Sequence, residues 1–212
     1  RRLRAKGVNR LATLISAIGM SIALSEGMRM LTNSRPVNVP RVLEKTVLFN
    51  IGSAQVRIDN VIVIFAAAII FIMLERFIKL SRMGKAIRAV SMSEENSKLM
   101  GINLNRVITA TFAIGGLTTG AAAFFFMVTY ENTVFNVGFQ LGIAAFTAAV
   151  LGGIGNLQGA FYGGLSLGLL EQFSSAILGS QWKSVTVFLV LVLVLLIRPS
   201  GIFGEAVQQT RT

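Results

Sequence analysis

Residues 132–170 read NTVFNVGFQLGIAAFTAAVLGGIGNLQGAFYGGLSLGLL and contain no charged side chain. A helix that crosses a bilayer needs only about 20 apolar residues, so this stretch is long enough for two passages. Residues 107–130 are also free of Asp, Glu, Lys and Arg. Uncharged segments of this length predict an integral membrane protein.

The composition of the whole chain supports this prediction. Of its 212 residues, 53% are hydrophobic and 14% are charged, and the mean hydropathy is +0.69. Soluble domains carry about 25% charged residues. The chain has no Cys and no His, which excludes disulfides, thiolate metal sites and imidazole-dependent catalysis. The net charge of +11 fits basic cytoplasmic loops better than nucleic-acid binding.

The apolar segments predict an all-α fold, a polytopic transmembrane bundle with some short or broken helices. Residues 61–80 and 107–130 have the length of full crossings, and residues 184–197 form a further apolar segment. Residues 11–25 are short for a crossing. Between 139 and 180 the chain must cross twice or dip and return. The break is expected in the glycine-rich stretch at residues 152–159.

The distribution of basic residues predicts the orientation. Residues 1–10 and 76–106 carry five and seven basic residues and are placed in the cytoplasm. Residues 26–59 and 130–138 are placed outside, the first with a small hairpin at 47–58. Because basic residues recur at every third position from 76 to 88, the preceding helix is expected to continue beyond the bilayer.

The basic loop contains the pattern of a short capped helix. Ser91 and Glu94 have the spacing of a capping box, and Gly101 stands where a glycine ends a helix. These residues predict a helix from about Met92 to Met100. Its apolar residues cannot face lipid from a basic loop, so we expect a protein partner. An interfacial helix on lipid is the alternative, disfavoured by two acidic residues in the helix.

Small residues in the second half of the chain predict close helix packing. GxxxG patterns begin at Gly116, Gly138, Gly159 and Gly164. Irregular backbone at membrane depth is tolerated only beside protein or a water-filled path, so the break is also a candidate translocation lining. The residues predicted for packing and lining are Gly116, Gly120, Gly152, Gly153, Gly155, Gly159, Gly163 and Glu171.

Two other motifs in the chain were weighed as functional sites. The glycine-rich break lacks the glycine at position 158 that a dinucleotide loop needs, and no GxxxxGK[ST] motif is present. Glu171 is the only acid between residues 132 and 204, which makes it a functional candidate. The alternative is a structural carboxylate near a helix end or subunit contact, satisfied by neighbouring polar side chains.

Three stretches of sequence resemble a known family. They are LISAIGMSIA at 14–23, SRMGKAIRAV at 81–90 with its continuation to Phe112, and AFTAAVLGGIG at 145–155. The closing RPSGIFG at 198–204 is also similar to the end of that family. Over essentially its whole length, the chain resembles permease subunits of bacterial, binding-protein-dependent ABC importers for branched-chain amino acids.

The resemblance implies one transmembrane permease domain over residues 1–212, preceded in the family by two or three further spans, in the bacterial inner membrane. Residues 81–106 would be the cytoplasmic coupling loop. The implied partners are ATPase subunits, a second permease subunit, an extracytoplasmic binding protein and the bilayer, without cofactor or enzymatic activity. The implied coupling residues are Arg88, Ser91, Glu94, Glu95, Leu99, Met100 and Gly101.

Two alternatives to this function remain open from the sequence. The first keeps the transporter class and changes the solute to urea, a short amide or another small polar molecule. The second is an ion-coupled secondary transporter or channel that uses Glu171.

Overall fold

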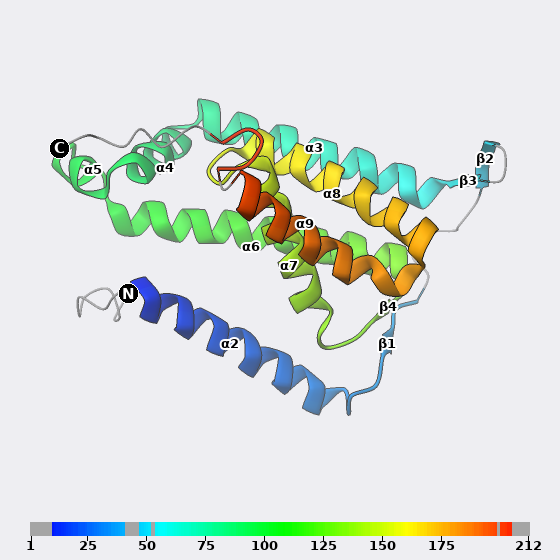
Figure 1. Cartoon of the computed structure of the whole chain (residues 1–212). Coiled ribbons are helices and arrows are strands. Elements are labelled where there is room, and N and C mark those ends of the chain that lie inside the picture. The colour runs from blue at the N-terminus through cyan, green and yellow to red at the C-terminus, as the bar shows by residue number, and fades with distance from the viewer. Residues whose placement is uncertain (1–9, 41–46, 52–53, 199, 205–212) are drawn as a thin grey trace. The chain divides into compact units, whose positions relative to one another are not determined.

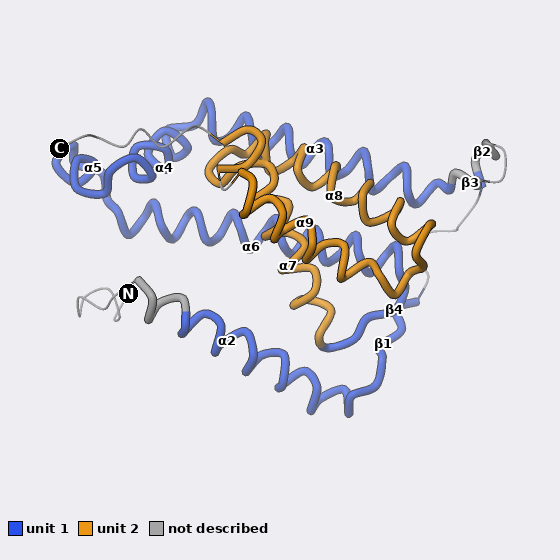
Figure 2. Tube along the Cα trace, in the orientation of Figure 1, with its two compact units in different colours: residues 1–135 blue, residues 136–212 orange. Residues whose placement is uncertain are grey.

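A computed structural model of the chain describes residues 10–40, 47–51, 54–198 and 200–204 (Figure 1). The chain divides into two compact units, residues 1–135 and 136–212 (Figure 2). The described part is largely helical, which confirms the predicted fold class. The assignment of one permease domain to residues 1–212 stays a prediction.

Unit 1 contains most of the helices and all four described strands. Its elements are α2 (Arg10–Leu31), β1 (Val37–Asn38), β2 (Val47–Ile51), β3 (Ala54–Arg57), α3 (Ile58–Leu80), α4 (Arg82–Met92), α5 (Glu94–Leu99), α6 (Leu104–Tyr130) and β4 (Asn132–Thr133). Unit 2 is helical throughout its described part. Its elements are α7 (Val137–Gly152), α8 (Leu157–Leu178), the 3-10 helix η1 (Ser180–Trp182) and α9 (Lys183–Ile197).

Three described segments are long and apolar enough to cross a membrane: α3, α6 and residues 180–197. The pair α7 and α8 passes the same test together but is bent by 119° at the break between them. The spans predicted at 61–80, 107–130 and 184–197 are therefore confirmed, as is the break after residue 152. The helix α2 extends well beyond the predicted segment 11–25, and its crossing stays a prediction.

Short strands lie in the two loops that were predicted to be outside the membrane, and one pair of strands joins these loops. β2 and β3 form the predicted antiparallel hairpin, although its Gly52-Ser53 turn lies outside the described residues. β1 pairs with β4, with Val37 opposite Thr133 and Asn38 opposite Asn132. The pairing joins one short strand from each of the two loops that were predicted to lie outside, which agrees with placing both loops on the same face of the membrane.

The predicted continuation of the helix 61–80 into the basic loop is wrong. α3 ends at Leu80, and Ser81 is extended, with ψ 153°, before α4 begins. The Ser81 hydroxyl accepts a hydrogen bond from the Gly84 N–H at 2.9 Å, so it caps α4. Gly84 packs directly on the backbone of Phe77 and Ile78, where a Cβ has no room. The spacing of the basic residues continues through this corner and therefore hides it.

The core of unit 2 lies where α7, α8 and α9 meet. Leu151, Leu167 and Val187 are buried there, one from each helix. The hydroxyls of Ser174 on α8 and Thr186 on α9 form a hydrogen bond at 2.5 Å. Most other large apolar side chains of these helices are exposed in the single chain, as expected where lipid or other subunits cover a bundle.

Candidate functional site

The first candidate site is the pair of short helices α4 and α5 in the basic loop. Figure 1 shows them at the end of α3 opposite to the β2–β3 hairpin. α4 packs on α3 and α6, and α5 contacts both α4 and α6. Arg88 of α4 donates a hydrogen bond to the Lys79 carbonyl at 3.3 Å, which ties α4 back to the end of α3.

The predicted capping box at Ser91 and Glu94 is wrong. Ser91 lies in the last turn of α4, and its hydroxyl donates to the Arg88 carbonyl at 2.8 Å. The cap of α5 is Ser93, whose side chain accepts from the Asn96 N–H at 3.2 Å. Ser93 is extended, with φ −156° and ψ 115°, and an N-cap residue needs this non-helical backbone.

The predicted end of the short helix at Gly101 is confirmed. The Gly101 N–H donates to the Lys98 carbonyl and the Ile102 N–H to the Ser97 carbonyl, both at 3.0 Å. Gly101 has φ +76°, the left-handed conformation that this double hydrogen-bond closure requires and that glycine adopts easily. The capped α5 therefore begins at Glu94 and ends at Leu99, shorter than predicted.

The corner presents an apolar cluster, which we define as Met92, Leu99 and Met100. These side chains are 89%, 83% and 84% exposed. They lie outside the described segments that are long and apolar enough to cross a membrane, which favours the predicted protein partner over a position in the bilayer core. Large apolar side chains exposed on one short corner make it a candidate interaction site.

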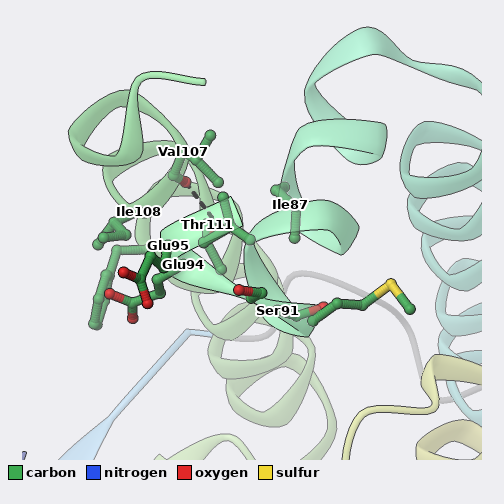
Figure 3. Close-up of a pocket in the computed structure, with 11 residues that line it drawn as sticks. Ile87, Ser91, Glu94, Glu95, Val107, Ile108 and Thr111 are labelled. Atoms are coloured by element: carbon green, nitrogen blue, oxygen red, sulfur yellow. Dashed lines mark hydrogen bonds between the residues drawn. The ribbon is translucent and has the colours of Figure 1, made fainter. Parts of the chain in front are cut away.

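A pocket of about 780 Å³ lies next to this cluster, between α4, α5 and the first turns of α6 (Figure 3). Its apolar lining includes Ile87, Val107 and Ile108. Glu94 and Glu95 lie in the first turn of α5 and form an acidic rim. Figure 3 labels both residues among those that line the pocket, with Ile108. The predicted coupling residues therefore gather around one corner, although Arg88 is engaged with α3.

The second candidate site is the break between α7 and α8. Gly152, Gly159 and Gly163 are buried where the two helix backbones touch, and a Cβ on any of them would fall on backbone atoms. Gly153 and Gly155 have φ of +107° and +95°, which favours glycine. The sequence analysis missed one feature of this site: residues 201–204 pack on the break. The two glycines of the closing RPSGIFG stretch mark it as irregular, but they do not identify what it packs against.

Of the other predicted residues, Gly116 and Gly120 lie on α6 outside the lining of the pocket, and Glu171 lies on α8 after the break. A Cβ added at Gly116 or Gly120 on α6 would meet no atom of the described structure within 4 Å. Glu171 is partly exposed on α8. Among the residues that the structure describes, no group of three or more carboxylates could hold a metal ion. A lining role for these residues stays a prediction.

Most of the chain is similar to known proteins. A family model described as a branched-chain amino acid transport system permease component matches residues 4–196. The high-affinity branched-chain amino acid transport system permease protein BraD of Pseudomonas aeruginosa is 40% identical over 94% of this chain. The corresponding permease protein LivH of Escherichia coli is 40% identical over 92% of it.

A more distant relative is the fructose import permease protein FrcC of Rhizobium meliloti, 24% identical over 68% of this chain and 41% of its own length. No solved structure matches the chain significantly. The chain spans just under two thirds of the closer relatives mentioned, 66% of BraD and 65% of LivH. The match and the apolar helices identify a multi-pass membrane protein. The chain belongs to the family of permease components of branched-chain amino acid transport systems.

Proposed function

We propose that the protein is the membrane-spanning permease subunit of an ATP-driven importer for branched-chain amino acids in a bacterial inner membrane. The names of relatives with 40% identity support the class and the substrate. The observation that carries the proposal is the exposed apolar cluster of Met92, Leu99 and Met100 on a capped corner outside the spans. Such a surface is suited to receive force from a separate ATPase subunit.

The capped corner supports a coupling role for residues 81–106. Ser81, Ser93 and Asn103 each cap the helix that follows them, and Gly101 closes α5. Because the starts of α4, α5 and α6 are capped and α5 is closed at Gly101, the loop can transmit a displacement to α3 and α6 rather than fray. ATP-driven closure of two ATPase subunits would shift the bundle between its outward- and inward-facing populations.

The remaining partners follow from the same proposal. A second permease subunit would complete the bundle, and an extracytoplasmic binding protein would deliver Leu, Ile or Val. The energy source would lie in the ATPase subunits, since the sequence contains no phosphate-binding loop. The break between α7 and α8 is the proposed neighbour of the translocation path.

Uptake by the assembled transporter tests the proposal. The protein would be reconstituted in proteoliposomes with its second permease subunit, its ATPase subunits and its binding protein, and uptake of labelled leucine compared with that of labelled urea. We expect leucine uptake that requires ATP and the binding protein. Uptake of urea but not leucine would keep the class and overturn the substrate.

A deletion and a point variant separate the proposed mechanism from its alternatives. Removing residues 91–100 is expected to abolish capture of the ATPase subunits while leaving membrane insertion intact. Normal capture would overturn the coupling assignment. Uptake that needs no ATP, and that loses its pH dependence in Glu171→Gln, would favour an ion-coupled transporter instead.

A further inference from the structure

The C-terminal end of α7 is completed by a distant part of the chain. The last carbonyls of any helix lack partners within the helix. Here the Ile202 N–H donates to the Leu151 carbonyl at 2.8 Å, and the Phe203 N–H donates to the Gly152 carbonyl at 3.1 Å. Residues 201–204, which follow α9, therefore form a strap across the break.

Glycines allow the strap to lie directly on the backbone of the break. Gly201 has φ +80°, and a Cβ there would collide with the Gly153 backbone and the Val150 carbonyl. Gly153 lies in the same way against Gly204. Gly153 and Gly201 are both buried. The backbone of the strap lies directly on the backbone of the break. Because these contacts leave no space between them, the strap fits in one position.

One side chain joins the strap to the start of α8. The Asn156 side-chain oxygen accepts from the Gly159 N–H at 3.0 Å and caps α8. Its Nδ2 donates to the Phe203 carbonyl at 3.1 Å. The ends of two helices and the segment after a third therefore meet at one asparagine.

We propose that the strap locks the α7–α8 break as a fixed corner, with Asn156 as its tether. Opening the corner would leave buried carbonyls without partners, which is costly in an apolar surrounding. A glycine-rich break is expected to bend as a hinge, but the strap holds its backbone in place and prevents this bending. If the protein is a transporter as proposed above, then α7, α8 and α9 move as one body during its cycle.

Amide hydrogen exchange tests the strap without relying on transport. The intact protein would be placed in nanodiscs with its ATPase subunits and studied without nucleotide and with ATP and vanadate. We expect slow exchange at Ile202 and Phe203 in both states. Fast exchange in the resting protein, or protection that is lost in one nucleotide state, would overturn the fixed corner.

Three variants separate the tether from the helix cap. Asn156→Asp keeps an oxygen that can cap α8 but loses the donor to Phe203, so exchange at 202–203 should rise about fivefold, the effect of one net hydrogen bond. Asn156→Ala loses both and should also loosen the first turn of α8. Asn103→Asp changes the equivalent cap of α6 and should leave exchange at 202–203 unchanged.

The outcomes distinguish failure of the strap from failure of the transport proposal. Wild-type exchange at 202–203 in Asn156→Asp would overturn the tether, whatever the transport result. Absence of ATP-driven uptake, with protection and the Asn156→Asp effect intact, would overturn the transport proposal and leave the strap in place.

Discussion

Two interruptions of helical structure are built in opposite ways. In unit 1, the corner from Ser81 to Asn103 is held mainly by side-chain caps, which satisfy helix ends with hydroxyl and amide groups. In unit 2, the break between α7 and α8 is held by glycine backbones in direct contact. Capping leaves the outer side chains of the first corner free for a partner, whereas at the second corner the glycine backbones are buried against each other.

Exposure of the side chains follows this difference. Met92, Leu99 and Met100 on the capped corner are more than four-fifths exposed. On α7 before the glycine break, Val150 and Thr147 are almost completely buried, at 1% and 0% exposure, although Ile154 within the break is 72% exposed. We therefore expect substitutions of exposed side chains at the first corner to weaken binding without unfolding the protein. Substitutions of the packed glycines at the second corner are expected to destabilise the fold.

The largest effect is expected from a single methyl group at the glycine break. In Gly152→Ala the added Cβ would fall on the Gly159 carbonyl, and overpacking of this kind costs about 3 kcal/mol or more. The fraction of monodisperse protein after detergent extraction, and its melting temperature, measure the effect. Gly168→Ala is the control, because a Cβ there meets no described atom within 4 Å. An unchanged melting temperature in Gly152→Ala would contradict the packed break.

The next effect concerns binding rather than folding. Replacing Met92, Leu99 and Met100 together by Ser should weaken capture of the ATPase subunits about 100-fold, since each apolar side chain that becomes partly buried on docking contributes about 1 kcal/mol. The affinity is measured by titrating purified ATPase subunits onto the protein in nanodiscs. Membrane insertion and the melting temperature should stay unchanged.

Val47→Ser serves as the control for the binding prediction. Val47 is also an exposed apolar residue, but it lies on the β2–β3 hairpin, which is predicted to face the other side of the membrane. Its affinity for the ATPase subunits should equal that of the unsubstituted protein. Equal losses in both variants would point to a general effect of polarity and not to a docking corner.

The sequence predicted the spans because lipid permits only long apolar helices, and this rule leaves a strong trace in composition. It also located the α7–α8 break and the end of α5, where glycine is needed for a positive φ. It did not predict the corner at Ser81, because the basic residues recur at the same spacing on both sides of it. The strap was missed because it joins residues about 50 positions apart in the sequence, a contact that local patterns do not contain.

Gly84 is the point where the capped corner most resembles the glycine break. A Cβ at Gly84 would fall on the backbone of Phe77 and Ile78, so Gly84→Ala should open the turn between α3 and α4 at a cost of about 2 kcal/mol. Amide exchange across residues 77–85 is expected to increase. Gly115→Ala on α6, where a Cβ meets no described atom within 4 Å, should leave this exchange unchanged. If amide exchange across residues 77–85 is unchanged in Gly84→Ala, the caps alone hold the corner.

The smallest effect distinguishes two hydroxyls that lie two residues apart. Ser93 accepts from the Asn96 N–H, so Ser93→Ala should cost α5 about 1 kcal/mol, a typical loss for an N-cap. The Ser91 hydroxyl only donates back to a carbonyl of its own helix, a contact that does little for helix stability, so Ser91→Ala should be nearly silent. Exchange at Asn96 should therefore rise about fivefold in Ser93→Ala alone. The reverse result would restore the capping box at Ser91, and α5 would then begin two residues earlier, with Met92 inside the helix that is proposed to face the ATPase subunit.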